Sequence, residues 1–342
     1  MKYIGLTTSI LVIFLLSISS MQIKNEILKD NTSVGEVLEK LGDTPLAKPD
    51  LSVNGVSAEK GKSLILTGFA KAPSGKMTDK QSKHFVCTSC HNIQREDPDL
   101  TISDPQARLE YAVENGLPFL QGTTLYGAAN RTNFYNDYYV EKYGDLVEDA
   151  KDDIRGAIKL CAVECAQGRE IEKWEVESVL AYLWEIDLKI SDLALTEAEH
   201  NQIEKALNAN AQDADLIKLI KEKYLQGSPA TFVKPPENRK TGYNLKGDPA
   251  NGKLIYEASC LHCHENQRYT FFNLNDTPLS HKFMTKHIPR YTRYSLYQVS
   301  RYGTYPLPGK RAYMPLYTAE KMSNQQMEDL RAYMKKMADS MN

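Results

Sequence analysis

The stretches Cys87-Thr88-Ser89-Cys90-His91 and Cys260-Leu261-His262-Cys263-His264 dominate the interpretation of this 342-residue chain, because each is a Cys-x-x-Cys-His motif. This spacing suits c-type haem attachment: two thiols one helical turn apart reach two vinyl groups of a porphyrin, and the adjacent histidine binds the iron. A zinc site would need two further ligands near each cysteine pair, and a redox dithiol does not need the histidine. We therefore predict two covalently bound haem c groups, attached through Cys87, Cys90, Cys260 and Cys263, with His91 and His264 as iron ligands.

The overall composition is that of a globular chain of about two domains. Lys and Arg number 42 against 44 Asp and Glu, so no chain-wide basic surface is available for nucleic acid. The mean hydropathy of −0.48 excludes a protein with many membrane spans, and 42% hydrophobic residues is too many for a disordered chain. The charge is unevenly divided: residues 95–190 carry 20 acidic and 10 basic side chains, and residues 221–342 carry 10 and 19. This polarity either holds two domains together or attracts an acidic redox partner protein to the basic second one.

The N-terminus has the pattern of an export signal. Lys2 is followed by an uncharged, largely apolar run over residues 3–21, with small residues near its end. Such a run is typical of a cleaved signal peptide, and its length also suits an uncleaved membrane anchor. We therefore predict a signal peptide or anchor over 1–21 and a polar arm over 22–55. The protein would be exported to the periplasm or the outer face of the cytoplasmic membrane, with membrane association only if the segment stays uncleaved.

Two pairs of similar segments indicate an internal repeat. Residues 61–65 (GKSLI) precede the first motif and residues 252–256 (GKLIY) precede the second. Residues 177–183 (ESVLAYL) and 328–334 (EDLRAYM) follow them at the far end of each unit. We therefore predict one domain over 56–190 and another over 246–342, joined by a helical linker over 191–245.

Each unit resembles a class I cytochrome c, in which an N-terminal helix with a glycine and an aromatic residue crosses a C-terminal helix with a tyrosine. The resemblance implies an all-α fold of two cytochrome c-like domains, each wrapped around one covalently attached haem c. It also implies that Gly252 permits close approach of the two helices, with Tyr256 packed near Leu330 and Tyr333.

The second iron ligand of each haem decides what kind of chemistry is available. For the second haem, Met314 lies 19 residues before Tyr333, the position of the axial methionine in class I cytochromes c. A thioether favours Fe(II), so this haem would have the higher potential. Other candidates for the same position are Met284, His281 and His287.

The first domain has neither usual ligand, because residues 92–199 contain no methionine and no histidine. Cys161 and Cys165 lie 21 and 17 residues before Tyr182 and so bracket the ligand position. A thiolate ligand would stabilise Fe(III) and lower the potential of this haem. Alternatively the two cysteines form a disulfide, which would need a broken helix, or neither binds and His84, a histidine of the second domain, a lysine or an open site takes the position.

The ligand pattern resembles that of dihaem thiosulfate dehydrogenases and related sulfur-oxidising cytochromes, which place a cysteine on the first haem and a methionine or lysine on the second. In these enzymes a glycine follows the ligating cysteine by seven residues, as Gly168 follows Cys161 here, and Ile158 also matches. The resemblance favours Cys161 as the ligand. The additional Cys165 and the sequence around His91 depart from the family.

The primary function expected is electron transfer from the first haem to the second and then to a redox partner protein. The alternative is an enzyme that oxidises a small sulfur anion at the first haem, with Cys161, Arg131 and Arg169 as its catalytic residues. Arg131 lies in a loop rich in small and hydroxyl residues, and Arg169 follows the cysteine pair; each would pair with a haem propionate or with a small anion.

Overall fold

A computed structural model describes residues 28–305 and 312–340 of the chain. Within these residues every regular element is a helix, and extended pairing is confined to isolated bridges that join Ser33 with Lys189, Lys71 with Met77 and Asn133 with Gly227. The all-α prediction is therefore confirmed for this part of the chain. The predicted signal segment, 1–21, lies outside the described residues.

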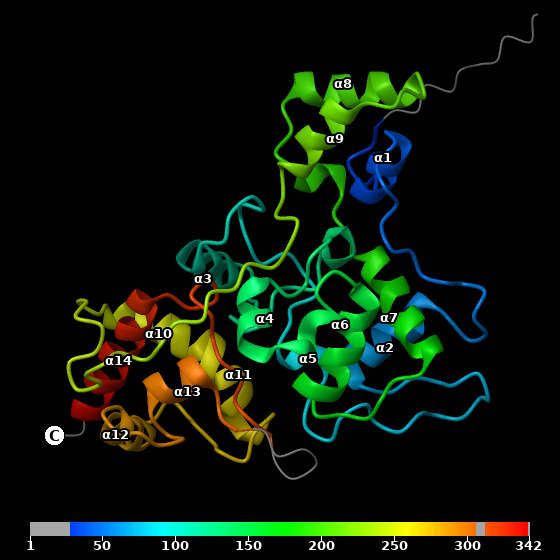
Figure 1. Cartoon of the computed structure of the whole chain (residues 1–342). Coiled ribbons are helices and arrows are strands. Elements are labelled where there is room, and N and C mark those ends of the chain that lie inside the picture. Colours follow the sequence, from blue (N-terminus) through cyan, green and yellow to red (C-terminus); the bar gives the residue numbers. More distant parts are fainter. Residues whose placement is uncertain (1–27, 306–311, 341–342) are drawn as a thin grey trace, which may run out of the picture.

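The helices are short and are joined by long loops (Figure 1). In chain order they are α1 (Val34–Lys40), α2 (Ala58–Thr67), α3 (Pro105–Glu114), α4 (Asp137–Tyr143), α5 (Asp145–Glu148), α6 (Ile154–Leu160), α7 (Lys173–Glu185), α8 (Glu197–Asn208), α9 (Ala214–Lys221), α10 (Pro249–Ile255), α11 (Leu261–His264), α12 (Pro278–His287), α13 (Leu296–Tyr302) and α14 (Asn324–Asp339). Two helices continue into a π-helical turn, α6 over Cys161–Cys165 and α10 over Tyr256–Cys260.

The same helix crossing occurs twice, as the repeat predicts: α2 packs on α7, and α10 packs on α14. Glycine makes both crossings close. A Cβ atom on Gly61 would lie 1.9 Å from the carbonyl oxygen of Ser178, and one on Gly252 would lie 2.0 Å from that of Asp329. Ser178 and Asp329 occupy equivalent positions in the repeated segments. The two crossings therefore use the same contact.

The aromatic packing predicted for the second crossing is also confirmed. The rings of Tyr256 and Tyr333 lie 5.7 Å apart, and Leu330 is buried in the same apolar cluster. A second cluster surrounds the first crossing and contains Leu64, Ile65, Trp174 and other residues of α2 and α7. Each crossing is thus the centre of a separate core.

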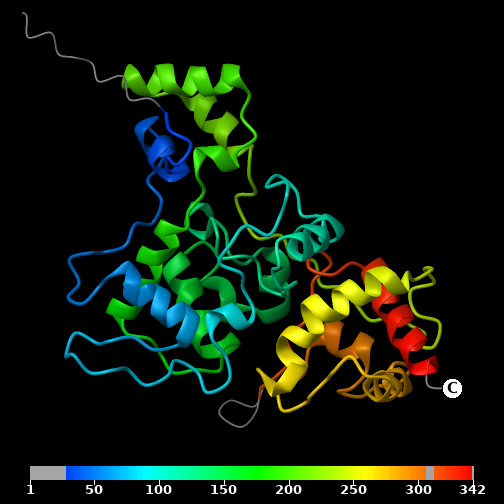
Figure 2. The same ribbon diagram turned by 180° about the vertical axis from the view of Figure 1, so that it is seen from behind.

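A third apolar cluster lies outside both cores. Helix α1, in the segment predicted as an arm, packs against α8 and α9 of the segment predicted as a linker, and these helices form a lobe at one end of the molecule (Figures 1 and 2). Leu38 and Leu41 meet Ile203 and Ile220 there. Each of these helices has one apolar face, which explains why they pack together although they lie far apart in the sequence.

The two halves of the molecule are in direct contact. Helix α3 belongs to the first half by sequence, yet Leu109 and Phe119 are fully buried in the core around α10 and α14. The backbone N–H of Phe119 donates to the carbonyl of Ala258 at 2.9 Å. The segment after α3 contacts both motif regions, because Phe119 bonds to Ala258, just before the second motif, and Gly122 bonds to Cys90 of the first.

Candidate haem sites

The second motif and its predicted partner line one cavity. Helix α10 and its π-helical turn lead directly into α11, which carries the motif. Cys260, Cys263, His264 and Met314 all line a cavity of about 610 Å³, within the usual volume range of cofactor pockets. Much of the remaining lining is apolar, including Leu274, Leu296, Leu330 and Met334. Cys260 and Met314, which are 54 positions apart in the sequence, thus line the same cavity. The cavity combines two thiols with two candidate iron ligands, which is the set that a covalently attached haem requires.

The orientation of His264 suits an iron ligand. Its Nδ1 atom lies 2.7 Å from the carbonyl oxygen of Phe272 and donates to it, which leaves Nε2 as the coordinating nitrogen. Burial lowers the pKa of His264, so the ring is held in the neutral form that binds metals.

Two hydrogen bonds to Thr304 hold the backbone of Met314 at the cavity. Its N–H donates to Thr304 Oγ1 at 2.8 Å, and its carbonyl accepts from the N–H of Thr304 at 2.9 Å. Among the other candidates, Met284 also lines the cavity. His281 is instead buried beside Tyr256 and Tyr333, with Nε2 2.8 Å from Asp276.

The first motif repeats the arrangement around its histidine. His91 Nδ1 lies 2.7 Å from the carbonyl oxygen of Thr123 and donates to it, again leaving Nε2 to bind a metal. The neighbouring Gly122 donates from its N–H to Cys90 at 2.9 Å, and a Cβ atom there would lie only 2.5 Å from the His91 ring. The loop that begins at Gly122 therefore borders the motif.

The two remaining cysteines lie on the π-helical turn that follows α6. Both are free thiols, and their side chains are hydrogen-bonded to each other. The hydrogen bond with Cys161 raises the pKa of Cys165 well above its usual value. Cys165 also acts electrostatically on the ring of His91. The turn therefore lies near enough to the first motif for the charge of Cys165 to act on His91.

The structure distinguishes the two cysteines. The family resemblance favours Cys161, whereas Cys165 is the thiol that interacts with the His91 ring and is exposed to solvent. The other neighbours of Cys165 are aromatic. The side chain of Tyr135 is hydrogen-bonded to it, and Tyr313 of the second half is close enough for the charge of Cys165 to raise the pKa of its hydroxyl. Both cysteines therefore stay candidate ligands of the first haem.

The two arginines predicted as catalytic residues both have protein partners. Arg131 donates to the carbonyl of Thr124 at 3.0 Å and, more weakly, to that of Tyr126 at 3.4 Å. Arg169 makes a forked ion pair with the buried carboxylate of Glu175, at 2.5 and 2.7 Å. Arg169 is thus paired with a protein carboxylate, whereas Arg131 donates to two backbone carbonyls of its own loop.

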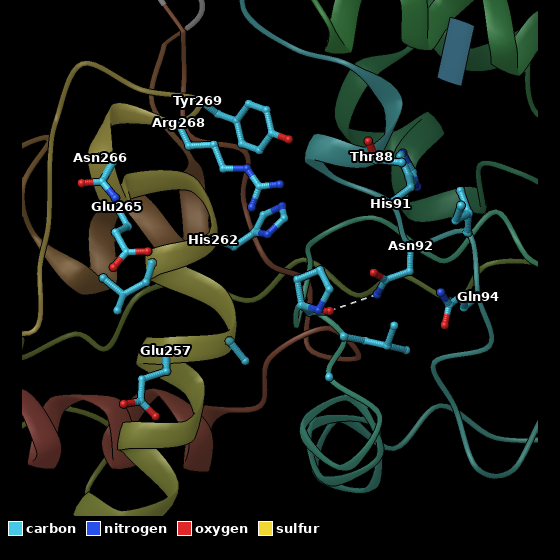
Figure 3. A pocket seen from close by; sticks show the side chains of 16 residues that line it. Thr88, His91, Asn92, Gln94, Glu257, His262, Glu265, Asn266, Arg268 and Tyr269 are labelled. Atoms are coloured by element: carbon cyan, nitrogen blue, oxygen red, sulfur yellow. Dashed lines mark hydrogen bonds between the residues drawn. The ribbon is translucent and has the colours of Figure 1, made fainter. Parts of the chain in front are cut away.

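The two motifs lie against each other. The Sγ atom of Cys263 is 4.0 Å from the carbonyl oxygen of Ser89. Beside this contact a cleft of about 790 Å³ separates the halves, and Figure 3 shows His262 and Arg268 of the second half facing Thr88 and His91 of the first. The two candidate sites are therefore neighbours in space.

Several residues at these sites were not predicted from the sequence. Glu96, Arg108 and Lys321 form a fully buried ionic cluster close to the first motif, and Tyr135 and Tyr313 flank the thiol pair. Glu96 and Lys321 lie outside the helices, where no periodicity marks a charged residue as buried, and Arg108 lies on α3. The only signal available was the number of charges in the 95–190 segment.

Comparisons of the chain with protein-family models, with curated proteins and with solved structures find no match. Within residues 28–305 and 312–340, no helix has the length and apolar character needed to cross a membrane. The same residues contain no group of three or more His, Cys, Asp and Glu side chains arranged to bind a metal ion by themselves.

Proposed function

We propose that this chain is an exported dihaem cytochrome c that transfers electrons from a first haem to a second. Each half would be a cytochrome c-like domain wrapped around one covalently attached haem, which supplies one-electron redox chemistry when bound. The observation that carries the proposal is the convergence of Cys260, Cys263, His264 and Met314 on one cavity. The identical carbonyl contacts of His91 and His264 support an equivalent role for the first motif.

The direction of transfer follows from the two distal groups. A thiolate from the cysteine pair stabilises the oxidised first haem, and the Met314 thioether favours the reduced second haem. Transfer from first to second is then downhill, by a factor of ten for each 59 mV of difference. The contact between Ser89 and Cys263 keeps the path between the two sites short.

The surface around the second cavity suits an acidic redox partner. Residues 277–319 contain no Asp or Glu; Lys286, Arg290 and Arg293 are exposed in this segment, and Arg293 lines the cavity. Three aromatic side chains at the cavity are also more than two-thirds exposed, namely Phe271, Tyr291 and Tyr305. A basic rim with exposed aromatic groups is complementary to an acidic protein surface, so electrons would leave through this side.

The test is electron paramagnetic resonance of the oxidised protein after its covalent haem content has been measured. We expect two haems per chain and two distinct low-spin signals, one thiolate/histidine and one histidine/methionine. The Cys161→Ala/Cys165→Ala double variant should lose the first signal and keep the second. A chain purified without covalent haem would overturn the proposal, and a spectrum unchanged by the double variant would remove the thiolate ligand from it.

The thiol pair also favours a second candidate, oxidation of a small sulfur anion at the first haem. A pure electron carrier has no need of a labile thiolate, and Tyr135 and Tyr313 provide hydroxyl groups beside Cys165. Two thiosulfate ions would join through a new S–S bond and release two electrons, one to each haem. Optical reduction of both haems by thiosulfate or sulfite, or their reoxidation by tetrathionate, tests this. If none of the three reacts, the plain carrier remains.

A further inference from the structure

Behind the first motif lies a buried carboxylate that the electron-transfer proposal does not use. Glu96 is fully buried, and its Oε1 atom accepts from the N–H of Thr124 at 3.0 Å. This N–H belongs to the same peptide group as the carbonyl of Thr123, which accepts from His91 Nδ1 at 2.7 Å. One peptide group therefore links the carboxylate to the histidine.

We propose that Glu96 is a positioning residue that tunes His91 as an iron ligand through the Thr123–Thr124 peptide group. A carboxylate that accepts from an amide N–H polarises the amide, and its carbonyl becomes a stronger acceptor. The Nδ1–H bond of His91 is then more polarised, which makes Nε2 a stronger donor to the metal. The inference rests on the proposed function, because it requires haem at the first motif.

The surroundings keep Glu96 charged. Burial by itself would raise its pKa, but Lys321 at 3.1 Å and Arg108 at 3.6 Å outweigh it and hold the pKa at about 2. Asn92 donates to the second carboxylate oxygen at 2.8 Å. The remaining charged groups nearby are Asp97 and Arg131.

Lys321 belongs to the second half of the chain and lies just before α14. Its backbone carbonyl accepts from the Arg108 guanidinium at 2.7 Å, so two of its groups take part in the cluster. Contact between the halves thus maintains the charge that acts on the first histidine.

The second motif lacks this arrangement. His264 donates to the carbonyl of Phe272, and in the described part of the chain no carboxylate accepts from the N–H of the following residue, Asn273. The chain of hydrogen bonds from Glu96 through the Thr123–Thr124 peptide group to His91, here called the relay, therefore distinguishes the two sites. It would strengthen the donation of His91 alone and add to the lowering of the first haem's potential by a thiolate.

The test is a redox titration of both haems in the Glu96→Gln variant, followed optically and by electron paramagnetic resonance. Glutamine keeps the shape but is a weaker acceptor for Thr124. At a fixed solution potential we expect the ratio of reduced to oxidised first haem to rise about tenfold, equivalent to about 59 mV. The spectrum of the oxidised first haem should also change, and the second haem should be unaffected.

Two matched variants separate the relay from charge alone. Lys321→Met changes the buried charge by one unit but keeps the Thr124 contact, so it should lower the potential without changing the spectrum. Glu328→Gln removes a buried carboxylate that is paired with Arg331 at 2.9 Å and belongs to the crossing of the second half, so it should leave the spectrum of the first haem unchanged.

An unchanged first haem in Glu96→Gln, or a shifted potential with an unchanged spectrum, would overturn the relay. If the single variant does not fold, the charge-balanced Glu96→Gln/Lys321→Met double variant replaces it, with the same spectral change expected. Loss of the proposed function is recognisable separately, because the wild-type chain would then carry no covalent haem.

Discussion

The two candidate haem sites are alike on one side and different on the other. In both, a glycine-dependent helix crossing leads to a Cys-x-x-Cys-His motif whose histidine donates Nδ1–H to a backbone carbonyl at 2.7 Å. Outside this shared part, the second site has Met314 in its cavity, and the first has a hydrogen-bonded thiol pair on a π-helical turn. The repeat therefore preserves the residues proposed to attach a haem and differs in the candidates for the other iron ligand.

The largest expected effect concerns the cysteines of the Cys-x-x-Cys-His motifs, which both sites share. Replacing Cys87 and Cys90 with serine, or Cys260 and Cys263 with serine, should remove one of two covalent haems, because each pair supplies both thioether bonds of one group. The haem content per chain is measured by the pyridine haemochrome spectrum. The Cys161→Ser/Cys165→Ser variant is the control and should keep both haems. Two haems remaining after either of the first two changes would contradict the assignment.

The helix crossings should be equally intolerant of a side chain. Gly61→Ala and Gly252→Ala each force a Cβ atom to within about 2 Å of a backbone carbonyl oxygen, so we expect each to lower the free energy of unfolding by about 3 kcal/mol. Thermal or denaturant unfolding of the haem-loaded protein measures this.

The control for this comparison is Lys253→Ala, beside Gly252 in α10. Lys253 is exposed and forms a surface pair with Glu257, so the change should stay within about 0.5 kcal/mol. A similarly small effect of Gly61→Ala alone would show that the two crossings are not equivalent.

A pH effect should follow from the buried Glu96 cluster beside the first motif. The pKa of Glu96 is about 2 when folded and near 4.5 when unfolded, so its contribution to stability is complete above pH 4.5 and is lost as the pH falls. Between pH 4.5 and 3 this loss is about 2 kcal/mol. In Glu96→Gln the free energy of unfolding should fall less steeply over this range. An identical slope in both proteins would exclude Glu96 as a source of acid sensitivity.

The smallest effect concerns the basic rim of the second site. Arg290→Ala/Arg293→Ala should slow oxidation of the reduced protein by the anion ferricyanide about threefold at low ionic strength, because both side chains are exposed and act by electrostatic attraction. Stopped-flow absorbance measures the rate. A cationic cobalt(III) oxidant provides the control, since its reaction should not be slowed. Equal slowing with both oxidants would place the effect on the haem rather than on the surface.

The shared part of the sites was largely predictable from the sequence, because its determinants are local. The motif spacing, the glycines and the repeated tyrosine lie within short segments, and Met314 keeps a regular distance from Tyr333. The helix crossing and the convergence of Met314 on the second cavity follow from these patterns.

The surroundings of the first motif could not be predicted in the same way. The Glu96–Lys321 pair joins residues 225 positions apart, and the position of Tyr313 beside the thiols depends on how the halves meet. The packing of α1 on α8 and α9 is equally non-local. In the choice between Cys161 and Cys165, spacing alone was insufficient, because a π-helical turn changes which residues share a helix face.

The contact between the two motifs has a consequence for biogenesis. In the folded chain Cys263 lies against Ser89, and Cys90 is close enough for Cys263 to raise its pKa. A maturation enzyme that attaches haem must reach both thiols of a motif, and the opposing half covers part of each motif once the halves have met. If the proposed haems are attached by such an enzyme, attachment before the halves dock would leave both motifs fully accessible, and the order of these events would become part of how the protein acquires its structure.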